Sequence, residues 1–276
     1  MRFKKSNKVL MKKLIILLAI AGFLTSCSVT ESIVFNNDMS GEYISSFDIT
    51  PIMNYANENR SRTNEALIKE EKVDTTVVFN DLFESYKDSI ATLSEVQRAK
   101  LENLRGMKMR VRMDVENDVF DFNIKKSFKA VSELENINEK VDDAMGIAKA
   151  MGSKDANASE GQLDKLTKVD KVVYTFEENT FTRFMPNAVV EQEKSNEGET
   201  TEADENDFSK QFEMQFEEIF STSYYKLVYT FPRKVKSVSN KNALISEDGK
   251  TVTYKVGWST LKEDATSMNL NVVLED

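Results

Sequence analysis

The chain has 276 residues, of which 46 are acidic and 37 basic, and it contains no His and one Cys. Without His, neither a Ser-His-Asp or Cys-His catalytic group nor the usual His-bearing zinc site can be built from this chain alone. A single Cys excludes an intramolecular disulfide, a CxxC redox pair and a thiolate metal cluster. The remaining composition, 40% hydrophobic and 30% charged, suits one large folded domain or two modest ones.

Residues 1–26 have the pattern of a bacterial lipoprotein signal peptide. Six basic residues and no acid precede an apolar run at 14–24, which is well short of the roughly 20 residues that span a bilayer. Leu24-Thr25-Ser26-Cys27 then resembles a lipobox. We expect cleavage before Cys27, a diacylglycerol on its thiol and a fatty acyl group such as palmitate on its new α-amino group. The alternative is a buried Cys at the end of a short helix, and Met11 is an equally good start.

The expected acylation gives the protein a membrane partner, because two or three chains anchor durably when each buried methylene contributes about 0.8 kcal/mol. Removing residues 1–26 with their six basic side chains leaves 250 residues and changes the net charge from −9 to −15, so we expect no nucleic-acid partner. Ser28 after Cys27 resembles the signal for the outer membrane of the bacterial cell envelope. No acidic run follows Cys27, which favours the periplasmic face and leaves the cell surface as the second location.

The first predicted elements form a hairpin over residues 31–50. Its apolar residues share one parity, and Asp38-Met39-Ser40-Gly41 between them has turn chemistry. These apolar residues are Ile33, Phe35, Tyr43, Phe47 and Ile49. The polar stretch that follows contains a loop or a short, mostly solvated helix at 57–72.

One long amphipathic helix is expected next, capped by Asn80 or Asp81 and ending at Gly106. Its apolar face is formed by Leu82, Phe83, Tyr86, Ile90, Leu93, Val96, Leu101 and Leu104.

Residues 107–116 alternate strictly between apolar and charged, which predicts a strand. Asn117-Asp118 is expected to form a two-residue turn into a return strand. That turn sets Asp114 against Asp121, with Arg112 as their diagonal partner. On the apolar face, the same register places Val115 opposite Phe120, Met113 opposite Phe122 and Val111 opposite Ile124.

Further elements are expected between residues 132 and 220. A helix at 132–151 precedes a linker-like segment at 152–161, which we expect to be mobile. Residues 171–176 and 180–184 flank Glu178-Asn179 as a hairpin. We also expect residues 187–207 to be mobile, since 191–207 contain eight acids against Lys194 alone. A helix then carries Phe208, Phe212, Phe216 and Phe220 on one face, as core or as a partner-binding face.

Strands are expected at 225–231, 243–246, 251–258 and 268–274, with Asp248-Gly249 as a tight turn and Trp258 on the apolar parity of its strand. The order of hairpins and helices lacks a regular βαβ alternation. The sequence therefore predicts one α+β domain over 27–276, with a mostly antiparallel curved sheet packed against about three amphipathic helices.

Three segments resemble the LppM-like family of bacterial lipoproteins, beside the lipobox Cys27. They are the turn at 37–43, the run at 229–235 and the run at 248–254. The resemblance covers the two ends of the mature chain. It implies an α+β lipoprotein domain that contacts envelope lipids or glycolipids, and the single site residue it carries over is Cys27, for lipid attachment.

No motif in the sequence predicts an enzyme, a cofactor or a metal site. Glycine-rich phosphate loops and a GxSxG elbow are absent from the sequence. Carboxylate pairs such as Asp81/Glu84 and Glu217/Glu218 are expected to be solvated, and neither 155–161 nor 247–249 has full EF-hand spacing.

Three functional hypotheses follow. The first is a lipid-anchored, non-enzymatic envelope protein that binds an apolar or amphiphilic ligand such as an envelope lipid. The second is a structural or assembly protein that binds another envelope protein through a strand edge or a helix face. The third, a carboxylate-based hydrolase, needs a cleft with two converging acids.

Overall fold

The computed structural model describes residues 27–54, 72–152, 171–186 and 221–276. The predicted signal peptide at 1–26 lies outside these residues, as do all but Lys72 of the segment at 57–72, all but Gly152 of the predicted linker at 152–161, and the whole of 187–220 with the expected phenylalanine helix.

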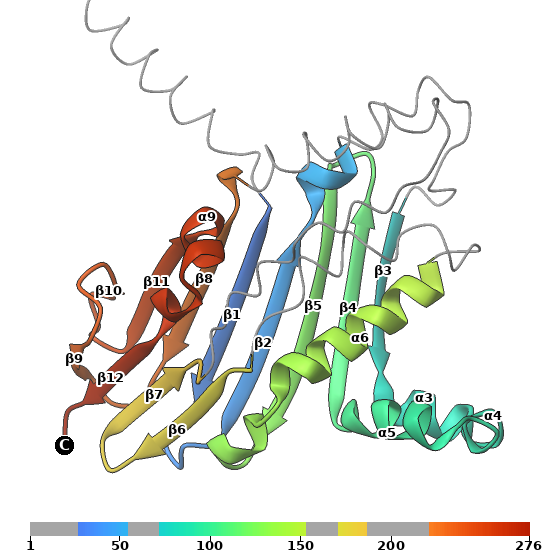
Figure 1. Cartoon of the computed structure of the whole chain (residues 1–276), viewed down its shortest axis with the longest axis horizontal. Helices are drawn as coiled ribbons and strands as arrows, with labels where there is room; N and C mark the ends of the chain where they lie inside the picture. The colour runs from blue at the N-terminus through green and yellow to red at the C-terminus, as the bar shows by residue number, and fades with distance from the viewer. Residues whose placement is uncertain (1–26, 55–71, 153–170, 187–220) are drawn as a thin grey trace, which may run out of the picture.

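Two sheets organise the described chain (Figure 1). The larger sheet has the strand order β10-β11-β8-β1-β2-β5-β4-β3, and the smaller one has the order β6-β7-β12-β9. Strand β1 runs parallel to β8, whereas the other strand pairs of the described residues are antiparallel. The larger sheet consists of β1 (Ser28–Phe35), β2 (Gly41–Asp48), β3 (Lys72–Val78), β4 (Met107–Asp114), β5 (Val119–Phe128), β8 (Tyr224–Thr230), β10 (Leu244–Ile245) and β11 (Thr251–Gly257); the smaller consists of β6 (Val173–Glu177), β7 (Thr180–Phe184), β9 (Val235–Val238) and β12 (Leu270–Leu274).

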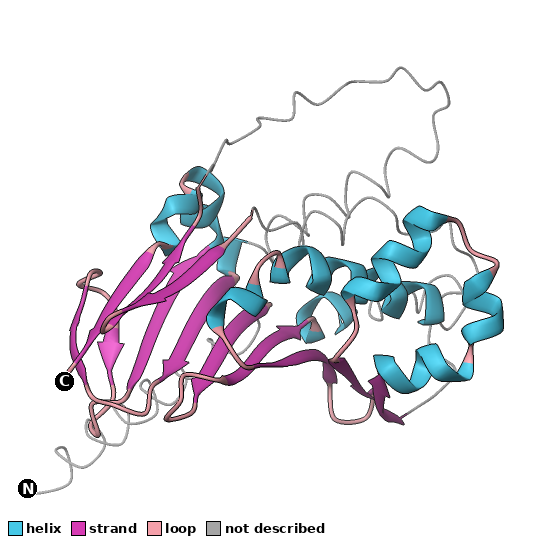
Figure 2. Ribbon diagram, turned by 90° about the horizontal axis from the view of Figure 1, so that it is seen from below, coloured by secondary structure: helices cyan, strands magenta, loops and turns pink. Residues whose placement is uncertain are grey.

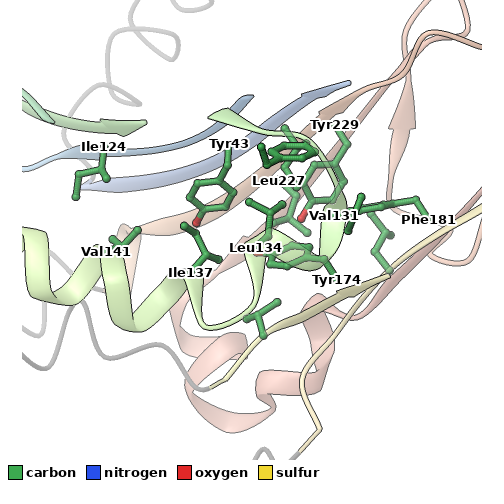
Figure 3. Packing of buried hydrophobic residues seen from close by; sticks show 14 of the residues in the cluster. Tyr43, Ile124, Val131, Leu134, Ile137, Val141, Tyr174, Phe181, Leu227 and Tyr229 are labelled. Carbon is green, nitrogen blue, oxygen red and sulfur yellow. The ribbon is translucent and has the colours of Figure 1, made fainter. Parts of the chain in front are cut away.

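The helices lie mostly along one side of the larger sheet (Figure 2). Figure 3 shows Ile137 and Val141 of α6 facing Tyr43 and Ile124 of the sheet, all four buried. The helical elements are α3 (Phe79–Ser85), α4 (Lys87–Ala91), α5 (Glu95–Asn103), η1 (Val131–Leu134), α6 (Ile137–Gly152), α9 (Trp258–Glu263) and η2 (Ala265–Met268).

Strand parity separates the two faces of the larger sheet. In β1, Glu31, Ile33 and Phe35 are buried, while Ser32 and Val34 between them face outward, Ser32 half-buried and Val34 exposed. The inner face therefore packs against the smaller sheet and the helices, while the outer face presents mainly polar side chains.

The predicted α+β class and its hairpins are confirmed. The turn between β6 and β7 holds Glu178 at φ 54°, and the turn between β10 and β11 holds Gly249 at φ 73°. Both turns therefore use the left-handed conformation that such tight connections require. The sequence did not predict strand β3. It also predicted a single sheet, without a second, smaller one.

The predicted register of the β4–β5 pair is wrong by two residues. The connection is a four-residue turn rather than a two-residue one, because Asp114 accepts hydrogen bonds from the backbone and side chain of Asn117. On the inner face, Met113 consequently lies opposite Phe120. On the outer face, Arg112 is directly opposite Asp121 and forms an ion pair with it.

The helix predicted from residue 80 to 106 is broken into α3, α4 and α5. Ser94 ends the second break with a capping box, in which its hydroxyl accepts from the Gln97 backbone and the Gln97 side chain accepts from the Ser94 backbone. Gly106, at φ 79°, ends the helical region as expected. Strand β11 ends at Gly257, one residue before the predicted end, and Trp258 is the first residue of α9, where its half-buried ring packs against the hydrophobic core.

Gly41 lies where the β1–β2 hairpin is most crowded. A Cβ at this position would meet the carbonyl oxygen of Val34 and come within 2.8 Å of Cζ of Phe128. We predict that Gly41→Ala lowers the free energy of unfolding by about 1–3 kcal/mol, because two packed elements must shift to admit the methyl group.

The measurement is urea unfolding, with Gly257→Ala as the matched control. Gly257 has an extended conformation, and no other group lies within 4 Å of the place that a Cβ would take there. Equal stabilities of the two variants would contradict the close packing at Gly41.

Candidate functional site

Cys27 lies directly before the first strand of the larger sheet. Strand β1 begins at Ser28, and the carbonyl oxygen of Cys27 accepts a hydrogen bond from the backbone nitrogen of Tyr224 at 3.4 Å. The Cys27 residue is 7% exposed. Burial raises the pKa of its thiol to about 11, against a smaller opposing hydrogen bond from the backbone of Ile52. The alternative interpretation of Cys27 is a buried residue at the end of a short helix. The burial agrees with it, and the residues of that expected helix, within 1–26, lie outside the described chain.

Aromatic and basic side chains lie at one corner of this end of the sheet. Tyr224 opens β8, and the ammonium of Lys255 on β11 lies 3.4 Å from the centroid of the Tyr224 ring. The backbone nitrogen of Trp258 donates to the carbonyl oxygen of Ser223 at 2.9 Å. The start of α9 is thus fixed beside the start of β8. In the sheet order, β11, which leads into α9, is the second strand from β1 and Cys27.

A polar hollow of about 380 Å³ lies on the outer face close to the same end. Ser46 donates to the side-chain oxygen of Asn123 at 2.7 Å on its floor, and Arg112 pairs with Asp121 at its wall. Hydroxyls and satisfied ion pairs in an open hollow can contact polar groups. They do not provide the apolar pocket expected for a lipid tail.

The strongest electrostatic feature is a buried cluster between the two sheets. Glu31 of β1 accepts hydrogen bonds from Nε and Nη2 of Arg183 on β7, at 3.2 and 3.3 Å, and both residues are 0% exposed. The hydroxyls of Tyr225 and Tyr229 also donate to the Glu31 carboxylate. Arg183 donates further to the carbonyl oxygen of Met268 at 3.2 Å. The cluster therefore joins both sheets to the segment before β12.

Burial determines how the groups of this cluster ionise. Burial raises the pKa of Tyr225 and Tyr229 well above 10, and the negative charge of Glu31 raises it further. Burial acts to lower the pKa of Arg183, but the attraction of Glu31 together with that of the neighbouring tyrosines outweighs it and leaves that pKa well above its usual value. These closed, fully paired groups are positioned for structure and are out of reach of a substrate.

Glu31 and Arg183 were missed in the sequence although a signal for them exists. Glu31 has the parity of Ile33 and Phe35, and Arg183 has the parity of Phe181. A charged residue at an apolar parity position on each of two strands predicts a buried pair, because an unpaired buried charge is prohibitively costly.

The other acids considered from the sequence do not converge in the described chain. Asp81 and Glu84 are exposed on α3, whereas Glu217/Glu218 and 155–161 lie outside the described residues. Glu247 is exposed, and Asp248 stabilises its own turn by accepting from Ser246 and the Lys250 backbone. Within the described ranges, no three acidic or cysteine side chains gather as a metal site requires.

The three segments that resemble LppM-like lipoproteins meet at the end of the larger sheet opposite Cys27. Asn37 and Asp38 of the first segment, Pro232 of the second and Lys250 of the third line one open hollow of about 630 Å³. The folded chain thus brings together residues more than 200 positions apart in the sequence.

No characterised protein family, curated protein or solved structure matches this chain. The LppM-like resemblance therefore stays a prediction. Among the helices of the described ranges, none has the length and apolar character needed to cross a membrane.

The buried pair predicts an asymmetric response to mutation. Arg183→Leu should lower the free energy of unfolding by about 3–5 kcal/mol, because it leaves the Glu31 carboxylate buried without its countercharge. The control is Arg110→Leu, which breaks the exposed ion pair with Asp74 and should change stability little. Urea unfolding measures the loss of stability in both variants, and equal losses would contradict the role given to burial.

Four tyrosines predict a loss of stability in alkali. Burial raises the pKa of Tyr43, Tyr174, Tyr225 and Tyr229 above the ordinary value of 10. The unfolded chain therefore releases protons that the folded chain holds, so stability is complete below about pH 10 and falls as the pH rises further.

Urea unfolding between about pH 8 and pH 11, followed with tyrosinate absorbance, measures this effect. Tyr43→Phe should reduce the slope of stability against pH. Complete tyrosine titration near pH 10 in the folded protein would contradict the prediction.

Proposed function

We propose that this protein is a lipid-anchored bacterial envelope protein, without enzymatic activity, that is held on the outer membrane through Cys27 and faces the periplasm. The observation that carries the proposal is the position of the lipobox cysteine. Cys27 is followed without a spacer by β1, and its carbonyl oxygen is hydrogen-bonded to β8. The mature N-terminus produced by cleavage at this point would be the first residue of the domain.

The state of the Cys27 thiol supports attachment over other roles. A thiol with a pKa of about 11 is almost wholly protonated at neutral pH. Because the thiolate is the reactive species, the folded domain suppresses nucleophilic and redox chemistry at this sulfur. Attachment by an enzyme during export needs no such reactivity in the folded state.

The proposed amphiphilic ligand is best placed on the surface of the domain. Between the sheets, the rings of Phe35, Phe181 and Phe231 pack with centroids 5.1–5.7 Å apart, and the Glu31–Arg183 pair lies nearby. This packing occupies the space that a lipid would take between the sheets. Contact with lipids is therefore expected at the outside of the fold, where the anchor places the bilayer.

One observation favours assembly with another envelope protein as a second function. At the β10 edge of the larger sheet, Leu244 and Ile245 are 70% and 43% exposed. An apolar edge strand can pair with a strand of a partner. Crosslinking in cells through a photoreactive residue at Leu244 tests this, and a defined adduct lost in Leu244→Lys would support it.

Lipid attachment predicts a change in thiol count and in location. The wild-type chain should sediment with membranes, carry acyl mass, and show no titratable thiol after denaturation, because Cys27 is the single Cys. Cys27→Ser should appear in the soluble fraction after lysis.

The control is Ser28→Ala, which keeps Leu24 to Cys27 intact and should stay with the membrane. Mass spectrometry and thiol titration in denaturant make the measurement. A full-length chain with one free thiol would overturn the proposed anchor.

A further inference from the structure

One corner of the Cys27 end combines the aromatic and basic residues that favour a membrane surface. Tyr224 donates its backbone N–H to Cys27, and Trp258 donates its own to Ser223. Since neighbouring strands lie about 5 Å apart, Trp258 is only about 10 Å from Cys27 along the hydrogen-bonding direction. Figure 1 shows α9, which begins with Trp258, at the end of the sheet opposite α3 and α4.

Because no linker separates Cys27 from β1, the proposed anchor holds this corner close to the bilayer. Consecutive Cα atoms are about 3.8 Å apart, and β1 starts one residue after Cys27. A lipoprotein with a long linker can float above the membrane, whereas here the acylated residue is continuous with a strand at the centre of the sheet. The start of β1 and of its neighbour β8 must therefore lie at the bilayer surface.

The side chains of the corner suit that surface. Trp258 and Tyr224 are both half-buried, so each ring packs against the protein and keeps an accessible part. Trp and Tyr prefer the membrane–water interface, where an apolar ring and a polar group are both satisfied. Lys255 beside Tyr224 is exposed and adds positive charge towards anionic headgroups.

The other corner of the same end has the opposite character. Glu116 and Asp118 are exposed in the β4–β5 turn, and Asp48 ends β2. The acids Asp114 and Asp121 of this region are paired with Lys72 and Arg112. The excess of acids over bases at this corner is repelled by anionic lipid, so the domain should tilt the side of β8, β11 and α9 towards the bilayer.

We propose that the corner formed by Tyr224, Lys255 and Trp258 lies in the headgroup region of the bilayer that holds the lipid anchor. The inference rests on the proposed lipid anchor at Cys27 and adds a direct protein–lipid contact with a defined orientation. Its ligand is the phospholipid surface itself.

Trp258 makes the test direct because it is the chain's one Trp. The full-length lipidated protein is extracted in mild detergent and reconstituted into phosphatidylcholine–phosphatidylglycerol vesicles. The vesicles carry bromine atoms either near the headgroup end of the acyl chains or near their tips. Bromine quenches tryptophan only at short range, so an interfacial Trp258 should lose intensity about twofold with the shallow bromines and less with the deep ones.

Two reporter variants serve as controls, both in a Trp258→Phe background. Tyr86→Trp places the reporter at a 58% exposed position beside α4, at the far end of the larger sheet. Val115→Trp places it at the acidic corner, where Val115 is 37% exposed. We expect no quenching for Tyr86→Trp and weaker quenching for Val115→Trp than for Trp258.

The outcomes separate this inference from the proposed anchor. Quenching that is strongest at Trp258, weaker at Val115→Trp and absent at Tyr86→Trp supports the orientation. Unquenched Trp258 in a protein that carries acyl mass and floats with the vesicles overturns the orientation and leaves the anchor standing. Equal quenching at all three positions, or at Trp258 and Val115→Trp, overturns the tilted corner. A protein without acyl mass that fails to float overturns the anchor and the orientation together.

Discussion

The buried contact between Glu31 and Arg183 is the constraint on which the two-sheet arrangement depends. Each charge loses its hydration on burial, and only the partner and additional hydrogen bonds can compensate. Two tyrosine hydroxyls donate hydrogen bonds to the carboxylate, while the Met268 carbonyl oxygen accepts one from the guanidinium. These directional bonds fix the smaller sheet at one position over β1, whereas aromatic packing alone would tolerate sliding. Parity shows why the cluster forms where it does, since both charges occupy inward-facing strand positions.

Local alternation predicted most of the strands, because the side chains of a strand face opposite sides of its sheet. The hairpin containing Ile33 and Tyr43, and the turns at Glu178 and Gly249, followed from this alternation and from turn chemistry. The parallel pairing of β1 with β8 could not be predicted in the same way. It joins segments almost 200 residues apart, and nothing in either strand alone specifies the partner.

The wrong predictions have local causes that compete with periodicity. The side chain of Asp114 binds Asn117 and lengthens a turn that looked like two residues, which shifts the β4–β5 register. Ser94 and Gln97 form a cap inside an apolar pattern that reads as one continuous helix. Of the candidate site, the sequence predicted Cys27, whereas its partner Tyr224 and the nearby Trp258 depend on which strands become neighbours.

The central position of β1 has a mechanical consequence. With the proposed lipid on Cys27, a force that pulls the domain from the membrane acts on the chain at Cys27, directly before β1. That strand is paired along its length with β2 on one side and β8 on the other. A pull along the strand loads the hydrogen bonds of both ladders together in shear, whereas a pull on an edge strand would open them one by one. The proposed anchor is thus joined to a strand that two neighbouring strands hold in place together.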